Sequence, residues 1–160
     1  MQETNWIDVE SPIGLIRIYE SNSKISGVEI AVKRLSKTSP QTPKVLKDAA
    51  KQIKDYFSGR SSKFDLPLEM HGTAFQKAVW KQISKVGFGK KVSYADIAQA
   101  IGKPKASRAV GGAVGANPIP LIVGCHRVLG TSGKITGYSG GKGIPTKQWL
   151  LKFEGIESKE

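Results

Sequence analysis

Three polar side chains stand together just after an apolar stretch, in positions where they could do chemistry. Cys125, the one cysteine among 160 residues, is followed directly by His126 and Arg127. A thiolate is the strongest nucleophile among the side chains, and cationic neighbours lower the pKa of a free thiol from about 8.5. The run therefore predicts nucleophilic chemistry at Cys125. The alternative is an inert thiol, buried at the end of an apolar strand.

Composition limits the partners of such a site. Lysine and arginine total 25 against 13 aspartates and glutamates, which gives a formal net charge of +12. A positive field of this size favours polyanions, although many basic proteins bind no nucleic acid. A lone cysteine excludes an intramolecular disulfide, and Cys125, His71 and His126 are too few ligands for a structural zinc site. We expect no metal, no cofactor and a reducing compartment.

Targeting signals are not apparent in the sequence. Residues 1–6 lack a basic segment followed by an apolar stretch, and no 18 apolar residues run together anywhere. These features predict a cytoplasmic protein, or a nuclear one in a cell with a nucleus, that does not enter a membrane.

The patterning predicts an α+β protein of two domains, residues 1–68 and 69–160. Alternation in residues 6–35, with turns near 11–14 and 21–23, predicts a small antiparallel sheet. Thr42 as N-cap and Pro43 at the first helical position predict one covering helix. Its expected inward face consists of Val45, Ala49, Ile53, Tyr56 and Phe57. Residues 59–70 read as a connector that packs by its apolar residues.

The second domain is predicted to be mainly helical. Capping boxes at Thr73 and Ser93 start two helices, and Gly102 ends the second of them. Only Lys103 and Pro104 separate it from a further helical segment, residues 105–116. Two short helices joined by a glycine-containing turn form a helix-turn-helix, whose second helix usually reads DNA.

That second helix carries an unusual glycine face. Gly111, Gly112 and Gly115 fall together with Arg108 at helical spacing. Each helix-interior glycine costs about 1 kcal/mol relative to alanine, so we expect a partner that approaches this face closely. The partner is either another helix packed at small residues or a nucleic-acid groove, and the groove accounts better for Arg108.

The motifs resemble those of a known family. In order they are Ser93-Tyr94, residues 105–113, residues 117–120, residues 125–128 and residues 137–141. This set is similar to the O6-alkylguanine-DNA alkyltransferases, also called methylated-DNA-protein-cysteine methyltransferases. The resemblance is dense over residues 59–155, whereas residues 1–58 agree only in broad pattern with the family's variable N-terminal domain.

The resemblance implies single-turnover DNA repair. The Cys125 thiolate takes the alkyl group from O6 of a damaged guanine, with O4-alkylthymine as a further candidate lesion, and keeps it as a thioether without a cofactor. A monomer acts on double-stranded DNA that contains the alkylated base. The nucleotide must leave the stack, because O6 is inaccessible in the duplex. Arg108 then fills the vacated place, and Tyr94 helps to rotate the nucleotide and to protonate or hydrogen-bond the leaving guanine. Their simpler roles are a phosphate contact and half-buried packing.

By the same resemblance, His126 is a base that acts through a water, and Glu154 orients it. Without the family, Glu154 would be a surface carboxylate. Adjacent strand residues point to opposite faces, so a turn or a water must join Cys125 to His126. Asn117 pins the active-site turn through its amide, or simply ends its helix before Pro118.

The remaining assignments concern the binding surface. Ser139 helps to hold the O6 end of the base, and Lys147 flanks the same pocket beyond a long loop, residues 142–146. Ser107 and Pro120, within the motifs, join Arg108 and the three glycines as DNA-binding residues.

One position departs from the resemblance. The residue before the nucleophile is commonly proline in that family and is Gly124 here, which loosens the backbone and restores an N–H. The preferred alkyl group therefore stays open. A non-catalytic branch of the family lacks the cysteine, so the presence of Cys125 disfavours it.

Two functions from other classes remain open. One is a helix-turn-helix module that binds DNA or signals damage, with a structural Cys125. The other is a cysteine-histidine hydrolase that uses His126 and Glu154 as a triad, in which the glycine face and the basic charge have no role.

Overall fold

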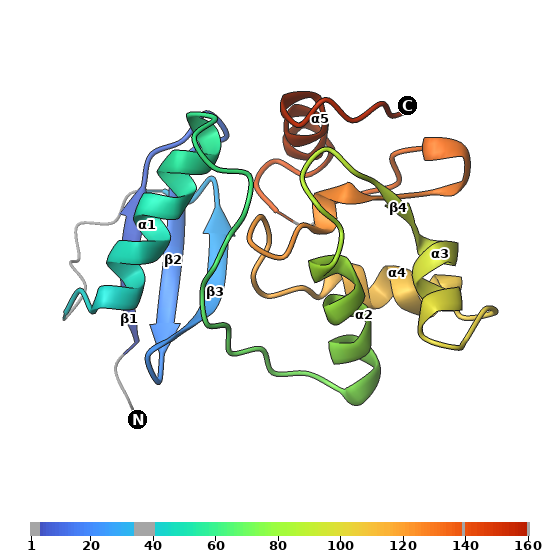
Figure 1. Cartoon of the computed structure of the whole chain (residues 1–160), viewed down its shortest axis with the longest axis horizontal. Helices are drawn as coiled ribbons and strands as arrows, with labels where there is room; N and C mark the ends of the chain where they lie inside the picture. The colour runs from blue at the N-terminus through green and yellow to red at the C-terminus, as the bar shows by residue number, and fades with distance from the viewer. Residues whose placement is uncertain (1–3, 34–40, 139, 160) are drawn as a thin grey trace. The chain divides into compact units, whose positions relative to one another are not determined.

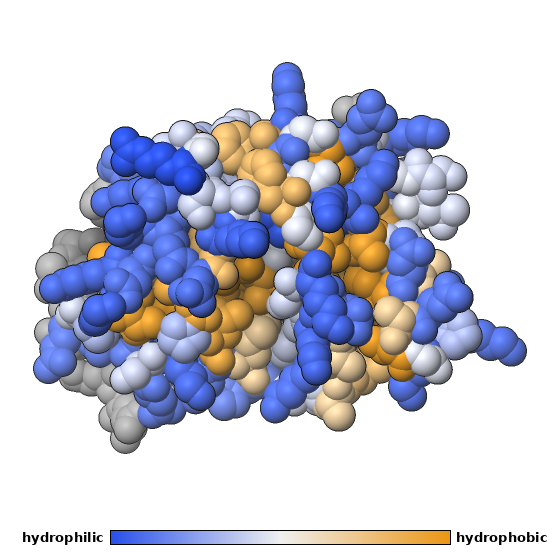
Figure 2. Space-filling view, in the orientation of Figure 1, coloured by the Kyte–Doolittle hydropathy of each residue, from blue (hydrophilic) through white to orange (hydrophobic). Residues whose placement is uncertain are grey.

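Two compact units make up the chain, residues 1–70 and residues 71–160. The structure is a computed structural model that describes residues 4–33, 41–138 and 140–159. Among these residues, no helix has both the length and the apolar character needed to cross a membrane. Hydrophilic residues cover much of the face shown in Figure 2, and apolar residues reach the surface in smaller groups.

The first unit is a three-stranded antiparallel sheet with one helix packed on it (Figure 1). Strand β1 spans Asn5–Val9, β2 spans Ile16–Ser21 and β3 spans Lys24–Ile30. Helix α1, Lys44–Phe57, contacts all three strands. The core between sheet and helix consists of fully buried side chains: Ile16, Ile18, Ile25, Leu46, Ile53 and Tyr56. The predicted sheet and covering helix are confirmed, while residues 34 and 35 of the predicted sheet lie outside the described residues.

Helix α1 begins one residue later than predicted. Pro43, with φ −64° and ψ 160°, is the N-cap, and no side chain caps the helix. The extended ψ keeps Pro43 outside the helix, while its carbonyl accepts the first hydrogen bond from Leu46 N at 3.0 Å. The buried face includes Leu46 in place of Val45, which is only half-buried. Thr42 is therefore not the N-cap.

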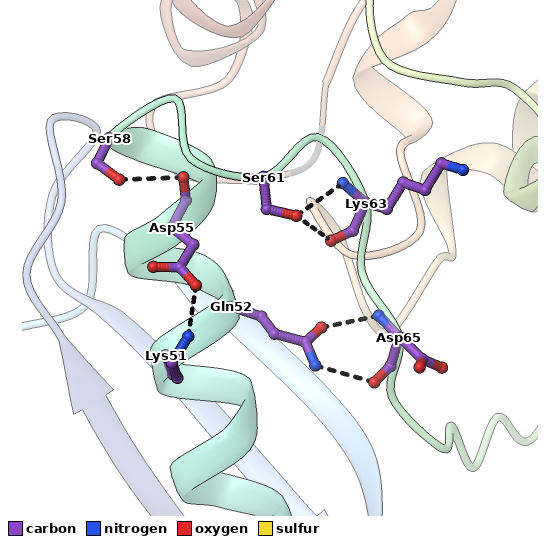
Figure 3. A network of polar contacts seen from close by, with 7 residues as sticks. All are labelled: Lys51, Gln52, Asp55, Ser58, Ser61, Lys63 and Asp65. Atoms are coloured by element: carbon purple, nitrogen blue, oxygen red, sulfur yellow. Dashed lines mark hydrogen bonds and ion pairs between the residues drawn. The ribbon is translucent and has the colours of Figure 1, made fainter.

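The connector after α1 is fastened to that helix by polar and aromatic contacts. The side-chain amide of Gln52 accepts from Asp65 N at 2.8 Å and donates to Asp65 O at 2.9 Å, as Figure 3 shows. Phe64 lies against Tyr56, with ring centroids 5.4 Å apart. Leu68 forms a parallel bridge with Ile25 at the edge of the sheet. The apolar residues of the connector therefore pack as predicted.

The second unit holds four α-helices and two short strands among its described residues. The α-helices are α2 (Ala74–Ser84), α3 (Tyr94–Ala100), α4 (Ser107–Gly115) and α5 (Ile144–Phe153). Strands β4 (Val92–Ser93) and β5 (Val128–Leu129) pair in parallel, and two 3-10 turns, Cys125–Arg127 and Thr131–Gly133, flank β5. Helices α2, α3 and α4 contact one another, and the Trp80 indole donates to Ala113 O at 2.8 Å.

Helices α3 and α4 form the predicted helix-turn-helix. Thr73 and Ser93 both make the expected capping boxes, at the starts of α2 and α3. Helix α3 ends in a Schellman motif, because Gly102 has a φ of +78° and Lys103 N donates to Ala98 O at 2.9 Å. Helix α4 begins at Ser107 and not at residue 105, since residues 103–106 form a separate turn closed by Ala106 N and Lys103 O.

Candidate active site

Cys125 lies in a tight backbone turn that sets the direction of its side chain. Gly124 has φ −73° and ψ 60°, and Cys125 N donates to Val123 O at 2.7 Å, which is the geometry of an inverse γ-turn. The 3-10 turn Cys125–Arg127 follows directly. The chain is therefore not extended here, and the turn expected between nucleophile and histidine is present.

Asn117 fastens this turn to the end of α4. The residue follows the helix C-cap, and its side-chain amide donates to Val123 O at 2.9 Å while accepting from Ile119 N at 3.0 Å. Both atoms of the amide are thus used within a buried loop. Asn117 ends the helix region and also pins the turn, so its two expected roles occur together.

Burial has a larger effect on the pKa of the Cys125 thiol than the neighbouring cations have. Cys125 is 2% exposed, and burial raises its pKa, although a hydrogen bond from Asn117 and the charge of Lys147 lower it in part. The expected net lowering of the thiol pKa by nearby cations is wrong for the resting site, because burial outweighs the lowering by Asn117 and Lys147. A thiol with a raised pKa needs a base before it can act as a nucleophile.

That base is available beside the nucleophile. His126 Nε2 and Glu154 Oε2 lie 2.6 Å apart, and both side chains are fully buried. Glu154 also accepts from Arg127 Nε, Arg127 Nη2 and Gly89 N, at 2.8, 3.0 and 3.0 Å. A carboxylate held by these donors is an acceptor toward His126, so Nε2 carries the imidazole proton.

The second imidazole nitrogen then has a free lone pair. His126 Nδ1 is buried and has no hydrogen-bond partner among the described residues. Burial lowers the pKa of His126, while Glu154 acts in the opposite direction. The imidazole is therefore neutral at neutral pH and able to accept a proton at Nδ1.

Glu154 is not a surface carboxylate. It is the C-cap of α5, and its side chain is fully buried under the donors just described. Sequence reasoning missed both Arg127 and Gly89 as partners of this carboxylate. The position of Arg127 next to His126 was a signal for the first contact. Nothing local indicated Gly89, which lies 65 residues from Glu154 in the sequence.

Lys147 is buried on α5 and holds two backbone carbonyls. Its Nζ donates to Val128 O at 2.6 Å and to Gly137 O at 3.0 Å. Burial lowers the pKa of Lys147 to about 8, and the nearby Cys125 opposes this. Lys147 does not line the pocket beside Cys125. It does hold Gly137, which lines that pocket.

The thiol borders an open pocket of about 980 Å³. Its walls come from the helix-turn-helix and from the loop after β5. The lining includes Tyr94, Ser107, Arg108, Gly111, Gly115 and Cys125 among the predicted residues, and Thr131, Thr136 and Tyr138 among those not predicted. The Tyr94 hydroxyl lies 2.9 Å from Thr136 Oγ1, which joins the two walls.

The glycine face of α4 is open within the described part of the chain. A Cβ built at Gly112 or Gly115 would meet nothing within 4 Å, and one at Gly111 would only touch the Tyr94 ring at 3.9 Å. No described helix packs on these glycines, so the first of the two proposed partners is not found. Arg108 is exposed on the same helix.

Besides Lys147, two of the predicted DNA-binding residues that the structure describes do not line the pocket. Gly112 is exposed on α4, and Pro120 is buried in the loop that follows it. Ser139 lies outside the described residues. Within the described ranges, no group of three or more His, Cys, Asp or Glu side chains is placed to bind a metal ion.

Comparisons with known proteins agree over nearly the whole chain. The family model of the DNA-binding domain of 6-O-methylguanine DNA methyltransferase matches residues 74–156, and that of its ribonuclease-like domain matches residues 6–70. The methylated-DNA–protein-cysteine methyltransferase of Methanosarcina barkeri is 42% identical over 150 residues, which cover 91% of this chain and 94% of that protein.

Solved structures show the same similarity. The crystal structure of Mycobacterium tuberculosis O6-methylguanine methyltransferase matches with a TM-score of 0.83 and 37% identity, covering 98% of this chain and 96% of that one. The structure of the M. tuberculosis protein OGT in complex with DNA matches with a TM-score of 0.83 and 41% identity, covering 93% and 91%. With its two domain models and these relatives, the chain belongs to the 6-O-methylguanine DNA methyltransferase family.

Proposed function

We propose that this protein repairs double-stranded DNA by moving a methyl or larger alkyl group from O6 of guanine to Cys125, irreversibly and once per molecule. The observation that carries the proposal is the pocket: one wall is the second helix of a helix-turn-helix, and a buried thiol with an adjacent neutral imidazole borders the same space. A DNA-bound nucleotide that leaves its stack beside α4 would enter next to the nucleophile.

The chemistry follows from the protonation states. His126 Nδ1 takes the proton of the Cys125 thiol through a bridging water, and Glu154 stabilises the resulting imidazolium. The thiolate attacks the alkyl carbon, so an S–C bond forms as the C–O6 bond breaks. The electron pair stays on guanine, which receives the proton that left the thiol. Tyr94 is the proposed hydrogen-bond donor to the leaving base.

The DNA-binding face is α4. Its glycines leave the backbone open to close approach, and Arg108 supplies the side chain that occupies the vacated place in the stack. Recognition by groove shape and backbone carries little base information, so binding should depend weakly on sequence and strongly on salt. We propose that a monomer acts in this way in the cytoplasm, where a reduced thiol persists.

The test is a mass measurement after incubation with a duplex that carries one O6-methylguanine. We expect one methyl group per protein, mapped to Cys125 and absent in Cys125→Ser. Tight binding with an unmodified Cys125 would instead indicate a recognition module, and repeated turnover on esters or amides would indicate a hydrolase. The same assay with a benzyl group at O6 and with O4-methylthymine defines the preferred lesion.

A further inference from the structure

Arg127 is a buried, permanently charged side chain that the reaction just described does not use. It is 7% exposed and makes three hydrogen bonds, two to the Glu154 carboxylate and one from Nη1 to Val86 O at 2.8 Å. Guanidinium and carboxylate form a forked pair, in which both carboxylate oxygens are held. A charge is buried in this way only where its partner is fixed.

The charges around His126 come from two elements, α5 and the 3-10 turn Cys125–Arg127. Glu154 at the end of α5 favours protonation of the imidazole, whereas Arg127 in the same 3-10 turn and Lys147 on α5 disfavour it. Cys125 precedes His126 and is neutral while its thiol is protonated. Of the two cations, only Arg127 touches the carboxylate, so Arg127 balances the charge that would otherwise draw a proton onto His126.

We propose that Arg127 is a positioning residue of the transfer reaction: by pairing with Glu154 it leaves His126 neutral, with Nε2–H directed at the carboxylate and Nδ1 free to receive the thiol proton. The inference rests on the proposed function. One turn then holds three consecutive residues with linked roles: the nucleophile Cys125, the base His126, and Arg127, which keeps the base unprotonated.

The same pair also fixes where the carboxylate lies. Arg127 is tied to Val86 O, and Glu154 Oε1 accepts from Gly89 N, so both partners are fastened to one segment between α2 and β4. The carboxylate therefore cannot rotate to release His126 without breaking a contact to that segment. The Arg127 side chain therefore sets both the position of the Glu154 carboxylate and the charge of His126.

The experiment compares Arg127→Gln with Arg17→Gln. Arg17 is a matched control, because it is also buried and also forms a forked pair with a carboxylate, Asp8, at 2.7 and 2.9 Å, but in the first unit. The protein has two histidines, so the NMR titration of His126 is read against the exposed His71 in the same spectrum. This titration needs no DNA, so it is independent of the proposed function.

We expect the midpoint of the His126 titration to rise by at least one pH unit in Arg127→Gln and to stay unchanged in Arg17→Gln. At a pH below both midpoints, methyl transfer by Arg127→Gln should be at least tenfold slower than by the wild type, and the difference should vanish at higher pH, where His126 is neutral in both proteins. Arg127→Lys, which keeps the charge but not the fork, should keep His126 neutral while transferring methyl more slowly than the wild type.

Two results would overturn the inference. The first is a His126 titration and a pH profile of transfer in Arg127→Gln that match those of Arg17→Gln. The second needs no variant: 15N NMR of the wild-type protein at pH 7 that shows a doubly protonated His126, or a proton on Nδ1 alone. If Arg127→Gln does not fold, the wild-type tautomer decides the question.

Discussion

Adding one methyl group at Gly124 tests how tightly the active-site turn is built. A Cβ at this position would lie 2.9 Å from Arg127 Nη1, 3.1 Å from Cζ and 3.2 Å from Cδ. A flexible side chain would move away at little cost, but three hydrogen bonds hold this guanidinium. Gly124→Ala should therefore displace Arg127 from at least one of its partners.

The size of the effect follows from two opposing contributions. Losing a hydrogen bond to a charged group costs about 1.5–3 kcal/mol. Replacing glycine by alanine where φ is negative stabilises by about 0.4–1 kcal/mol, because the unfolded chain has fewer conformations to lose. The free energy of unfolding of Gly124→Ala should thus fall by about 0.5–2.6 kcal/mol.

Urea unfolding of Gly124→Ala beside Gly87→Ala separates these contributions. A Cβ at Gly87 would meet only Lys90 Cδ, at 3.8 Å, so this variant should show the entropic gain alone. Gly124→Pro restores the residue common in the family that the sequence resembles. The φ of −73° suits proline, but its Cβ meets Arg127 as that of alanine does, so Gly124→Pro should lose a similar amount of stability.

Equal stability of Gly124→Ala and Gly87→Ala would refute the predicted clash, since the guanidinium would then move without losing a partner. A destabilised Gly124→Ala whose His126 titration stays at its wild-type position would also refute it. The clash acts on the side chain that we propose to hold His126 neutral, so displacing Arg127 should raise the pKa of His126.

Three further outcomes are expected. Folding lowers the pKa of His126, so below pH 6.5 the unfolded chain binds a proton that the folded chain does not. The free energy of unfolding should therefore fall as the pH drops below 6.5, by at most about 1.4 kcal/mol per pH unit. Urea unfolding at several pH values checks this, and His126→Asn should lack the slope. Lys147→Met should lower the free energy of unfolding by about 2–4 kcal/mol, because two carbonyls lose their donor. It should also slow iodoacetamide labelling of Cys125 at a given pH, because a cation that lowers the thiol pKa is gone. Tyr94→Phe should change stability by less than about 1 kcal/mol, since Thr136 is the one hydrogen-bond partner of its hydroxyl among the described residues. The single-turnover transfer rate should fall, and an unchanged rate would remove Tyr94 from the proposed reaction.

Local signals in the sequence determined the helix-turn-helix and the position of the nucleophile. The capping boxes at Thr73 and Ser93 and the glycine stop at Gly102 are contacts between residues at most five apart, so the residue types specify them without the rest of the fold. The start of α1 differs by one residue from the predicted start. Pro43 fits both the N-cap and the first helical position, and its extended ψ of 160° places it at the N-cap.

The state of the active site was decided only by the tertiary structure. Glu154 meets His126, Arg127 and Gly89 across separations of 28, 27 and 65 residues, and the resemblance supplied only the first of these contacts. The raised pKa of the Cys125 thiol and the free Nδ1 of His126 both depend on burial, which no local pattern encodes. A sequence states which groups are present, whereas desolvation and long-range pairing fix their charges, because both arise only when distant segments exclude water together.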